Sequence, residues 1–125
     1  DVNKYRINKA KQYSDVVIDA TKQSVIDNIR ELTKEHGGAD VIIESTAAPS
    51  VYQTMFEMAR PEAHIMIIGL PDEEIPINVG KYIGIKGLTV KDTLWTDHKK
   101  GVYNEMADLL ESCLNLDAFW KYVGN

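Results

Sequence analysis

Short apolar runs alternate along the chain with segments in which apolar residues recur every three or four positions. The runs DVVID (15–19), ADVIIES (39–45) and AHIMIIG (63–69) are typical of strands buried on both faces. The periodic segments predict helices at 6–13, 24–36, 49–60 and 99–115. Strands that alternate with helices predict an α/β fold, a doubly wound parallel sheet with helices on both faces.

The segment after the third apolar run is less regular. NVGKYIGIKG (78–87) contains three glycines and is predicted to be a loop with ladder pairing at its ends, whereas KGLTVKDTLW (86–95) is rich in strand-forming residues. If EIPINVG (74–80) and IKGLTVKD (85–92) form the last strands, an edge near 75–91 carries apolar side chains and few charges. Such an edge pairs readily with another chain, so we expect a homodimer or tetramer through this edge strand.

Composition and charge exclude several classes of protein. The 125 residues are the size of one modest domain, and the formal net charge of −5 argues against a nucleic-acid surface, which needs clustered Lys and Arg. No apolar run reaches the roughly 18 to 20 residues of a membrane span, and no secretory leader is visible. We therefore expect a cytoplasmic location, with no membrane and no nucleic acid as partner.

Residues with catalytic or metal-binding chemistry are scattered. The single cysteine, Cys113, is expected to be a small core residue on a helix, and it allows no disulfide within the chain. His36, His64 and His98 fall on a predicted helix end, a strand and a loop, with no spacing that would bring two of them together as metal ligands. We predict no metal site and no catalytic residue in these 125 residues.

Small side chains follow the second apolar run, in the stretch GGADVIIESTAAPS (37–50). In an open parallel sheet, ligands lie beyond the carboxyl ends of the strands. Small residues after Glu44 and the glycine at the end of AHIMIIG would leave a trough at that edge. Two interpretations are open: a ligand-binding trough, or tight strand-to-helix turns with no ligand.

Four segments in order carry a resemblance to a known family. DVNKYRINKAKQY, GGADVIIESTAA, MARPEAHIMIIGLP and KGLTVKDTLW resemble the nucleotide-binding domain of medium-chain, zinc-type alcohol and polyol dehydrogenases, and the resemblance covers nearly the whole chain. It implies a Rossmann-like domain that binds NAD in an enzyme that transfers a hydride between NAD and a small alcohol or polyol. It also implies that 1–125 is a partial dinucleotide-binding domain. On this resemblance, we expect the first βαβ half and a catalytic domain, which would hold zinc, to lie outside these 125 residues.

The resemblance also implies which residues contact the cofactor. Asp1 matches the acid that binds both hydroxyls of the adenosine ribose and so selects NAD over NADP, and Arg6 matches a basic residue near the same ribose. Val2 and Thr46 match positions on either side of the adenine, and Ser45 lies in the same turn as Thr46. The remaining predicted contacts, to the nicotinamide, are Ile68, Gly69, Leu70, Thr93 and Trp95.

The chain also departs from the family's pattern. The glycine-rich phosphate turn expected about 20 residues before the ribose acid would lie before Asp1. The paired glycine usual before the strand at 63–69 is replaced by PEA (61–63), and Asp92 stands where a glycine is common. Two alternatives remain open: a zinc-free, quinone reductase-like member of the same superfamily, and a non-catalytic α/β module that binds a nucleotide or a protein.

Overall fold

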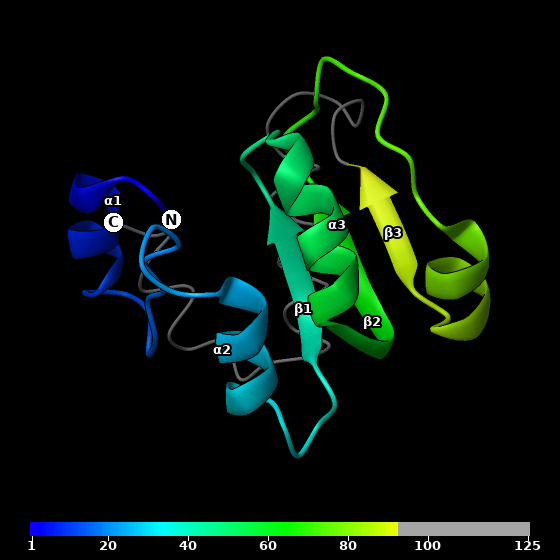
Figure 1. Ribbon diagram of the computed structural model, residues 1–125, viewed down its shortest axis with the longest axis horizontal. Helices are drawn as coiled ribbons and strands as arrows, with labels where there is room; N and C mark the ends of the chain where they lie inside the picture. Colours follow the sequence, from blue (N-terminus) through cyan, green and yellow to red (C-terminus); the bar gives the residue numbers. More distant parts are fainter. Residues whose placement is uncertain (93–125) are drawn as a thin grey trace, which may run out of the picture.

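The computed structural model describes residues 1–92, which form four helical segments and three strands (Figure 1). The predicted helix at 99–115, the end of the strand-rich segment 86–95, and Cys113 lie outside the described residues. In chain order the elements are α1 (Lys4–Ala10), α2 (Val25–Leu32), β1 (Ala39–Glu44), α3 (Pro49–Met58), β2 (Ala59–Ile67), the π-helical segment η1 (Gly80–Ile85) and β3 (Thr89–Asp92).

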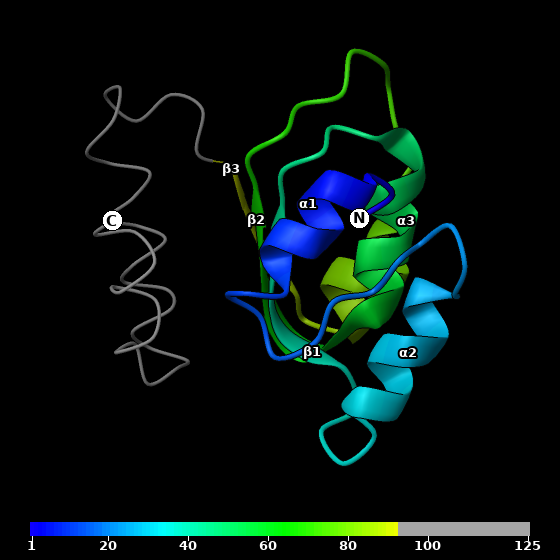
Figure 2. The same cartoon turned by 90° about the vertical axis from the view of Figure 1, so that its left-hand side faces the viewer.

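The three strands form one parallel sheet in the order β1-β2-β3. β2 is the central strand, and α3 connects β1 to it. Helices α2 and α3 lie on the same side of the sheet (Figure 2). The α/β class with a parallel sheet, predicted from the alternating pattern, is confirmed.

The helices begin where local sequence dictates. The Ser24 hydroxyl accepts a hydrogen bond from the Asp27 amide and caps α2, and Pro49 occupies the first turn of α3. Both helices end earlier than the spacing predicted, at Leu32 and at Met58. α3 stops there because Ala59 already has extended dihedral angles and starts β2.

The predicted strand at 15–19 is absent from the sheet, so this prediction was wrong. The segment is extended but makes only isolated contacts: the Asp1 nitrogen donates to the Ile18 carbonyl oxygen at 3.0 Å, and the Ala20 amide donates to the Asp1 carbonyl oxygen at 3.0 Å. A run of extended residues becomes a strand only with a partner along its length. Within residues 1–92, the backbone pairing of this segment is with Asp1 alone, and α1 begins three residues later, at Lys4.

The prediction of last strands at 74–80 and 85–92 was only partly right. Residues 89–92 form β3, but 74–79 contain no strand, and η1 replaces the predicted loop at 80–85. The Tyr82 ring stacks on Phe56 of α3 with centroids 4.9 Å apart, and its hydroxyl donates to Glu57 at 2.6 Å. This buried aromatic contact holds the segment against α3, where it cannot also extend along the sheet. The apolar edge expected at 75–85 is therefore not a sheet edge.

The core lies between the sheet and α3. Its largest fully buried side chains are Met55 and Phe56 of α3 with Ile65 of β2. Tyr82 and Leu88 join this cluster from the segment that leads into β3. The packing of α3 against β2 thus fixes the position of the strand ends at which the candidate site lies.

Lys86 closes the C-terminal end of α3. Its ammonium nitrogen donates to the carbonyl oxygens of Phe56 (2.9 Å), Glu57 (3.3 Å) and Ala59 (2.7 Å). The last carbonyls of a helix have no partner within it, so the ammonium donates to acceptors that would otherwise lack a hydrogen bond. Burial lowers the pKa of Lys86 from its ordinary value, because desolvation disfavours the charged form.

Replacing this lysine should destabilise the fold. Lys86→Met keeps most of the aliphatic stem but removes every donor, and we expect the free energy of unfolding to fall by about 2 to 3 kcal/mol. Lys34→Met is the matched control, because Lys34 is exposed and pairs with Glu31 at the surface. Its cost should stay within about 0.5 kcal/mol. Urea denaturation measures both, and equal midpoints for the two variants would contradict this role of Lys86.

A bulge interrupts β2 at PEA (61–63), where the family that the chain resembles usually has a pair of glycines. Ala39 pairs with Ala59 and Val41 with His64, so residues 60–63 lie opposite a single residue of β1. Glu62 has φ of 62°, in the left-handed region, and its amide donates to the Lys86 carbonyl oxygen at 2.7 Å. The backbone therefore keeps a conformation suited to glycine although the side chain is glutamate.

The strain at the bulge can be measured by comparing two substitutions. Glu62→Gly and Glu62→Ala both remove the carboxylate, but only glycine adopts this φ without steric cost. The glycine variant should be about 1 kcal/mol more stable than the alanine variant by urea denaturation. If alanine were as stable as glycine, the backbone at 62 would not be left-handed.

Candidate functional site at the carboxyl end of the sheet

The three strands end level with one another. Glu44 is in register with Ile67, and Ile67 with Asp92, so the last residues of β1, β2 and β3 form one row. The turns that follow β1 and β2 leave the sheet from the same edge (Figure 1). This is the edge at which open parallel sheets bind ligands. It contains two groups of predicted cofactor residues, Ser45 with Thr46 and Ile68 to Leu70.

The Glu44 carboxylate organises the turn after β1. Glu44 is 2% exposed. One carboxylate oxygen accepts hydrogen bonds from the Thr46 amide (2.7 Å) and the Thr46 hydroxyl, and the other accepts from the Ala47 amide (3.3 Å). Burying a carboxylate is costly unless its oxygens are hydrogen-bonded, and here the turn itself supplies the donors.

The turn after β2 lies directly against the turn after β1. The amides of Ile68 and Gly69 donate to the Glu44 carbonyl oxygen at 2.7 and 3.1 Å. A Cβ at position 69 would lie 2.5 Å from the Ala47 nitrogen and 2.9 Å from a Glu44 carboxylate oxygen. Only glycine fits there, so the contact between the two turns requires a glycine at position 69.

Tyr52 of α3 holds the second turn from the helix side. Its hydroxyl donates to the Gly69 carbonyl oxygen. Burial raises the pKa of Tyr52, and the negative charges of Glu44 and Asp92 raise it further. The phenol is therefore kept in the protonated form that can donate this hydrogen bond.

Ala47 has an unusual backbone conformation, with φ of 58°. A non-glycine residue pays a steric cost in this region, and such residues persist where surrounding contacts fix them. The contact that fixes Ala47 is the bond from its amide to Glu44. The next residue, Ala48, is already the N-cap of α3 and offers no side-chain hydrogen bond.

The predicted ribose residues form a second cluster at the start of α1. The Arg6 guanidinium pairs with the Asp1 carboxylate, at 2.8 Å from Nε and 3.1 Å from Nη2. The same carboxylate accepts from the amides of Val2 (2.7 Å) and Asn3 (2.8 Å). Arg6 and Asp1 thus hold each other in place, and both are solvent-accessible.

The structure joins some of the predicted residues and leaves others apart. It brings Ser45, Thr46, Ile68 and Gly69 together, and it joins Asp1 to Arg6. Val2 and Leu70 are exposed. Thr93 and Trp95 lie outside the described residues.

Sequence reasoning missed how the turns are held. The sequence predicts no catalytic residue, Glu44 included, and indicates no partner for Glu44 or for Tyr52. The signal for Glu44 was an acid at the end of an apolar run, immediately before small residues that can donate backbone hydrogen bonds. Tyr52 gave no local signal, because its partner Gly69 is 17 residues away.

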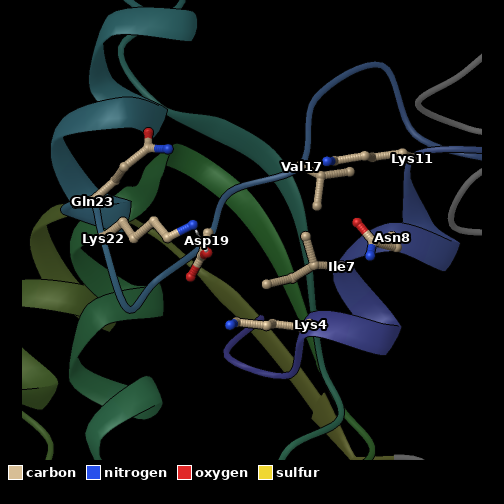
Figure 3. A pocket seen from close by; sticks show the side chains of 8 residues that line it. All are labelled: Lys4, Ile7, Asn8, Lys11, Val17, Asp19, Lys22 and Gln23. Atoms are coloured by element: carbon tan, nitrogen blue, oxygen red, sulfur yellow. Dashed lines mark ion pairs between the residues drawn. The ribbon is translucent and has the colours of Figure 1, made fainter.

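A cavity of about 340 Å³ lies apart from these turns, between α1 and the segment that follows it (Figure 3). Lys4, Ile7 and Asn8 of α1 and the C-cap Lys11 line one side, and Val17, Asp19, Lys22 and Gln23 face them from the following segment. Lys22 pairs with Asp19 at 3.2 Å. None of the predicted cofactor residues lines this cavity.

Residues 1–92 contain no group of three or more His, Cys, Asp and Glu side chains arranged to hold a metal ion. In the same part of the chain, no helix is long and apolar enough to cross a bilayer.

The match to a family model places the chain among known proteins. The model described as zinc-binding dehydrogenase matches residues 1–112. The chain therefore belongs to the zinc-binding dehydrogenase family, and the resemblance inferred from its four segments is confirmed.

The similar proteins include several L-threonine 3-dehydrogenases. The chain is 32% identical over 92 residues to the one from Symbiobacterium thermophilum, which covers 73% of the chain and 26% of that protein. It is also 32% identical over 117 residues to the one from Idiomarina loihiensis, which covers 93% of the chain and 33% of that protein. The chain thus spans about a third or less of the length of these relatives.

Solved structures show the same fold. Benzyl alcohol dehydrogenase from Acinetobacter calcoaceticus matches with a TM-score of 0.69 at 23% identity, over 90% of the chain and 31% of that protein. The 2R,3R-butanediol dehydrogenase from Bacillus subtilis matches with a TM-score of 0.69 at 22% identity, over 94% of the chain and 33% of that protein. These matches confirm the partial Rossmann-like fold.

Proposed function

We propose that this chain is the NAD-binding part of a zinc-type dehydrogenase that transfers a hydride between an alcohol and NAD. The observation that carries the proposal is the row of strand ends at Glu44, Ile67 and Asp92, in a chain that belongs to the zinc-binding dehydrogenase family. Rossmann-like domains bind dinucleotides at this edge. The chain alone is expected to be inactive, because the substrate pocket and the zinc would lie in other parts of the enzyme.

The residues at this edge fit a dinucleotide in their chemistry. The Asp1 carboxylate, fixed by Arg6 and two backbone amides, offers acceptors for the hydroxyls of a ribose. The two turns offer small side chains and backbone groups, from Ser45 with Thr46 and from Ile68 to Leu70. Bound NAD would supply the hydride acceptor, and these residues would bind and orient it. Thr93 and Trp95 complete the proposed set.

The names of the relatives support a proposal for the substrate class. L-threonine 3-dehydrogenases are named for oxidation of the hydroxyl-bearing carbon of threonine, and benzyl alcohol and 2R,3R-butanediol dehydrogenases are named for other alcohols. We accordingly propose a small alcohol or polyol as substrate, with an amino alcohol such as threonine as the first to test. A cytoplasmic location remains a prediction.

Cofactor choice tests the proposal at Asp1. In the complete enzyme, Asp1→Ala should weaken NAD binding by roughly 1 to 3 kcal/mol, because charge-assisted hydrogen bonds to the ribose are lost. Discrimination against NADP should relax, because a 2′-phosphate no longer meets a carboxylate. Isothermal titration calorimetry with both cofactors, before and after the change, measures these effects.

Asp15→Ala is the control, since it removes the same charge from an exposed position outside both clusters. It should leave both affinities unchanged. An unchanged preference for NAD in Asp1→Ala would show that Asp1 does not bind the ribose. A wild-type enzyme that prefers NADP would favour the zinc-free reductase alternative.

We also propose that the protein assembles through the edge of β3. All four residues of β3 are exposed, and among residues 1–92 this strand pairs on one side only, with β2. A two-fold contact would join this edge to its own copy and extend the sheet.

Val90→Lys should therefore shift the complete protein toward monomer in sedimentation experiments, because it places a charge and its copy near the symmetric seam. Ile85→Lys is the control, since Ile85 is 85% exposed and lies on η1 outside the strand. A dimer that withstands Val90→Lys with unchanged affinity would place the interface elsewhere.

A further inference from the structure

We propose that Glu44 is a positioning residue that holds both cofactor-binding turns in one arrangement. The inference rests on the proposed function, because it concerns the turns to which NAD binding is assigned. Glu44 makes no contact with the cofactor in this proposal. It acts through Thr46, Ala47 and Gly69.

A carboxylate at this position needs an explanation. The other residues of β1 after Asp40 are Val41, Ile42 and Ile43, and an apolar residue at the strand end would avoid burying a charge. Glu44 is nevertheless almost fully buried. At this position the main effect of the carboxylate is to accept hydrogen bonds from the following turn.

The hydrogen bonds divide between the two turns. The carboxylate accepts from the amides of Thr46 and Ala47 and from the Thr46 hydroxyl, which fixes the turn after β1. The backbone carbonyl of the same residue accepts from the amides of Ile68 and Gly69, which fixes the start of the turn after β2. One residue thus sets the separation of the two turns.

The groups in contact with the Glu44 side chain make this network of hydrogen bonds specific to a carboxylate. Position 69 is so near the carboxylate oxygen that a Cβ there would approach within 2.9 Å. Both carboxylate oxygens face backbone N–H donors. An amide in place of the carboxylate would present its NH₂ group to one of those donors, whichever way it is turned.

The network also limits what Thr46 can offer a ligand. Its hydroxyl donates to Glu44 and accepts from the Ala48 amide at 3.1 Å. The hydroxyl proton is therefore committed to Glu44. Thr46 would meet an adenine without donating a hydrogen bond, and its main contribution would be the position of the turn.

The test compares Glu44→Gln with Asp40→Asn in the complete enzyme. Both changes replace a carboxylate of β1 by an amide, but Asp40 lies at the surface, where it pairs with Arg60. We expect Glu44→Gln to weaken NAD binding about tenfold or more in calorimetry, because a partly buried backbone amide loses its acceptor. Asp40→Asn should bind NAD as the wild type does.

Amide hydrogen exchange separates a positioning role from a general loss of stability. In Glu44→Gln, exchange at Thr46 and Ala47 should become faster while Ile65 in the middle of β2 stays protected. The Michaelis constant for NAD should rise, whereas that for the alcohol should change little. Thr46→Val, which removes the hydroxyl, should show a smaller change in the same direction.

Three outcomes decide the question. Weakened NAD binding with local loss of protection in Glu44→Gln supports the inference. Wild-type NAD affinity in Glu44→Gln would overturn it and leave the proposed function intact. A wild-type enzyme that binds neither NAD nor NADP would overturn the proposed function and this inference with it.

Discussion

The parallel pairing of β2 with β1 is the interaction on which the rest of the structure depends. β2 is the central strand, and its side chains Ala63, Ile65 and Met66 are almost completely buried. A parallel pair cannot be closed by a short hairpin, so the chain must cross over one face of the sheet, and α3 makes that crossover. The same register aligns Glu44 with Ile67, and this alignment lets the two turns meet.

The candidate site follows from that alignment through a short series of contacts. Because Glu44 and Ile67 are level, the amides of Ile68 and Gly69 reach the Glu44 carbonyl oxygen. Because Gly69 has no side chain, its turn packs against the carboxylate and the Ala47 nitrogen. Tyr52 then binds the turn to α3, the helix that crosses over from β1 to β2. Sheet, helix and turns therefore support one another, and a change in any of them would be transmitted to the site.

The sequence predicted those features that depend on local pattern. The runs at 39–45 and 63–69 form β1 and most of β2. The segments with helical periodicity at 24–36 and after Pro49 form α2 and α3. These elements have apolar faces that match their own geometry, so pattern alone identifies them. The ordered set of four segments was specific enough to predict the family and the partial Rossmann-like fold.

The sequence could not predict features that depend on distant partners. The run at 15–19 looks like a buried strand, but it is not part of the sheet, because strand formation depends on a neighbour along its whole length. The segment at 80–85 is helical because Tyr82 stacks on Phe56, which is 26 positions earlier in the chain. The Glu44 network similarly needs Gly69. Each partner is far away in sequence, so a local window contains no information about the contact.

The two left-handed residues show how such contacts replace a local signal. Ala47 and Glu62 both have φ near 60°, which sequence rules assign to glycine. Each is fixed by a hydrogen bond from its own amide, to the Glu44 carboxylate in one case and to the Lys86 carbonyl oxygen in the other. Where an acceptor is held in place by the surrounding fold, it can impose a conformation that the residue would not choose alone. The turn at the candidate site is thus specified less by its own small residues than by the buried acid that precedes them.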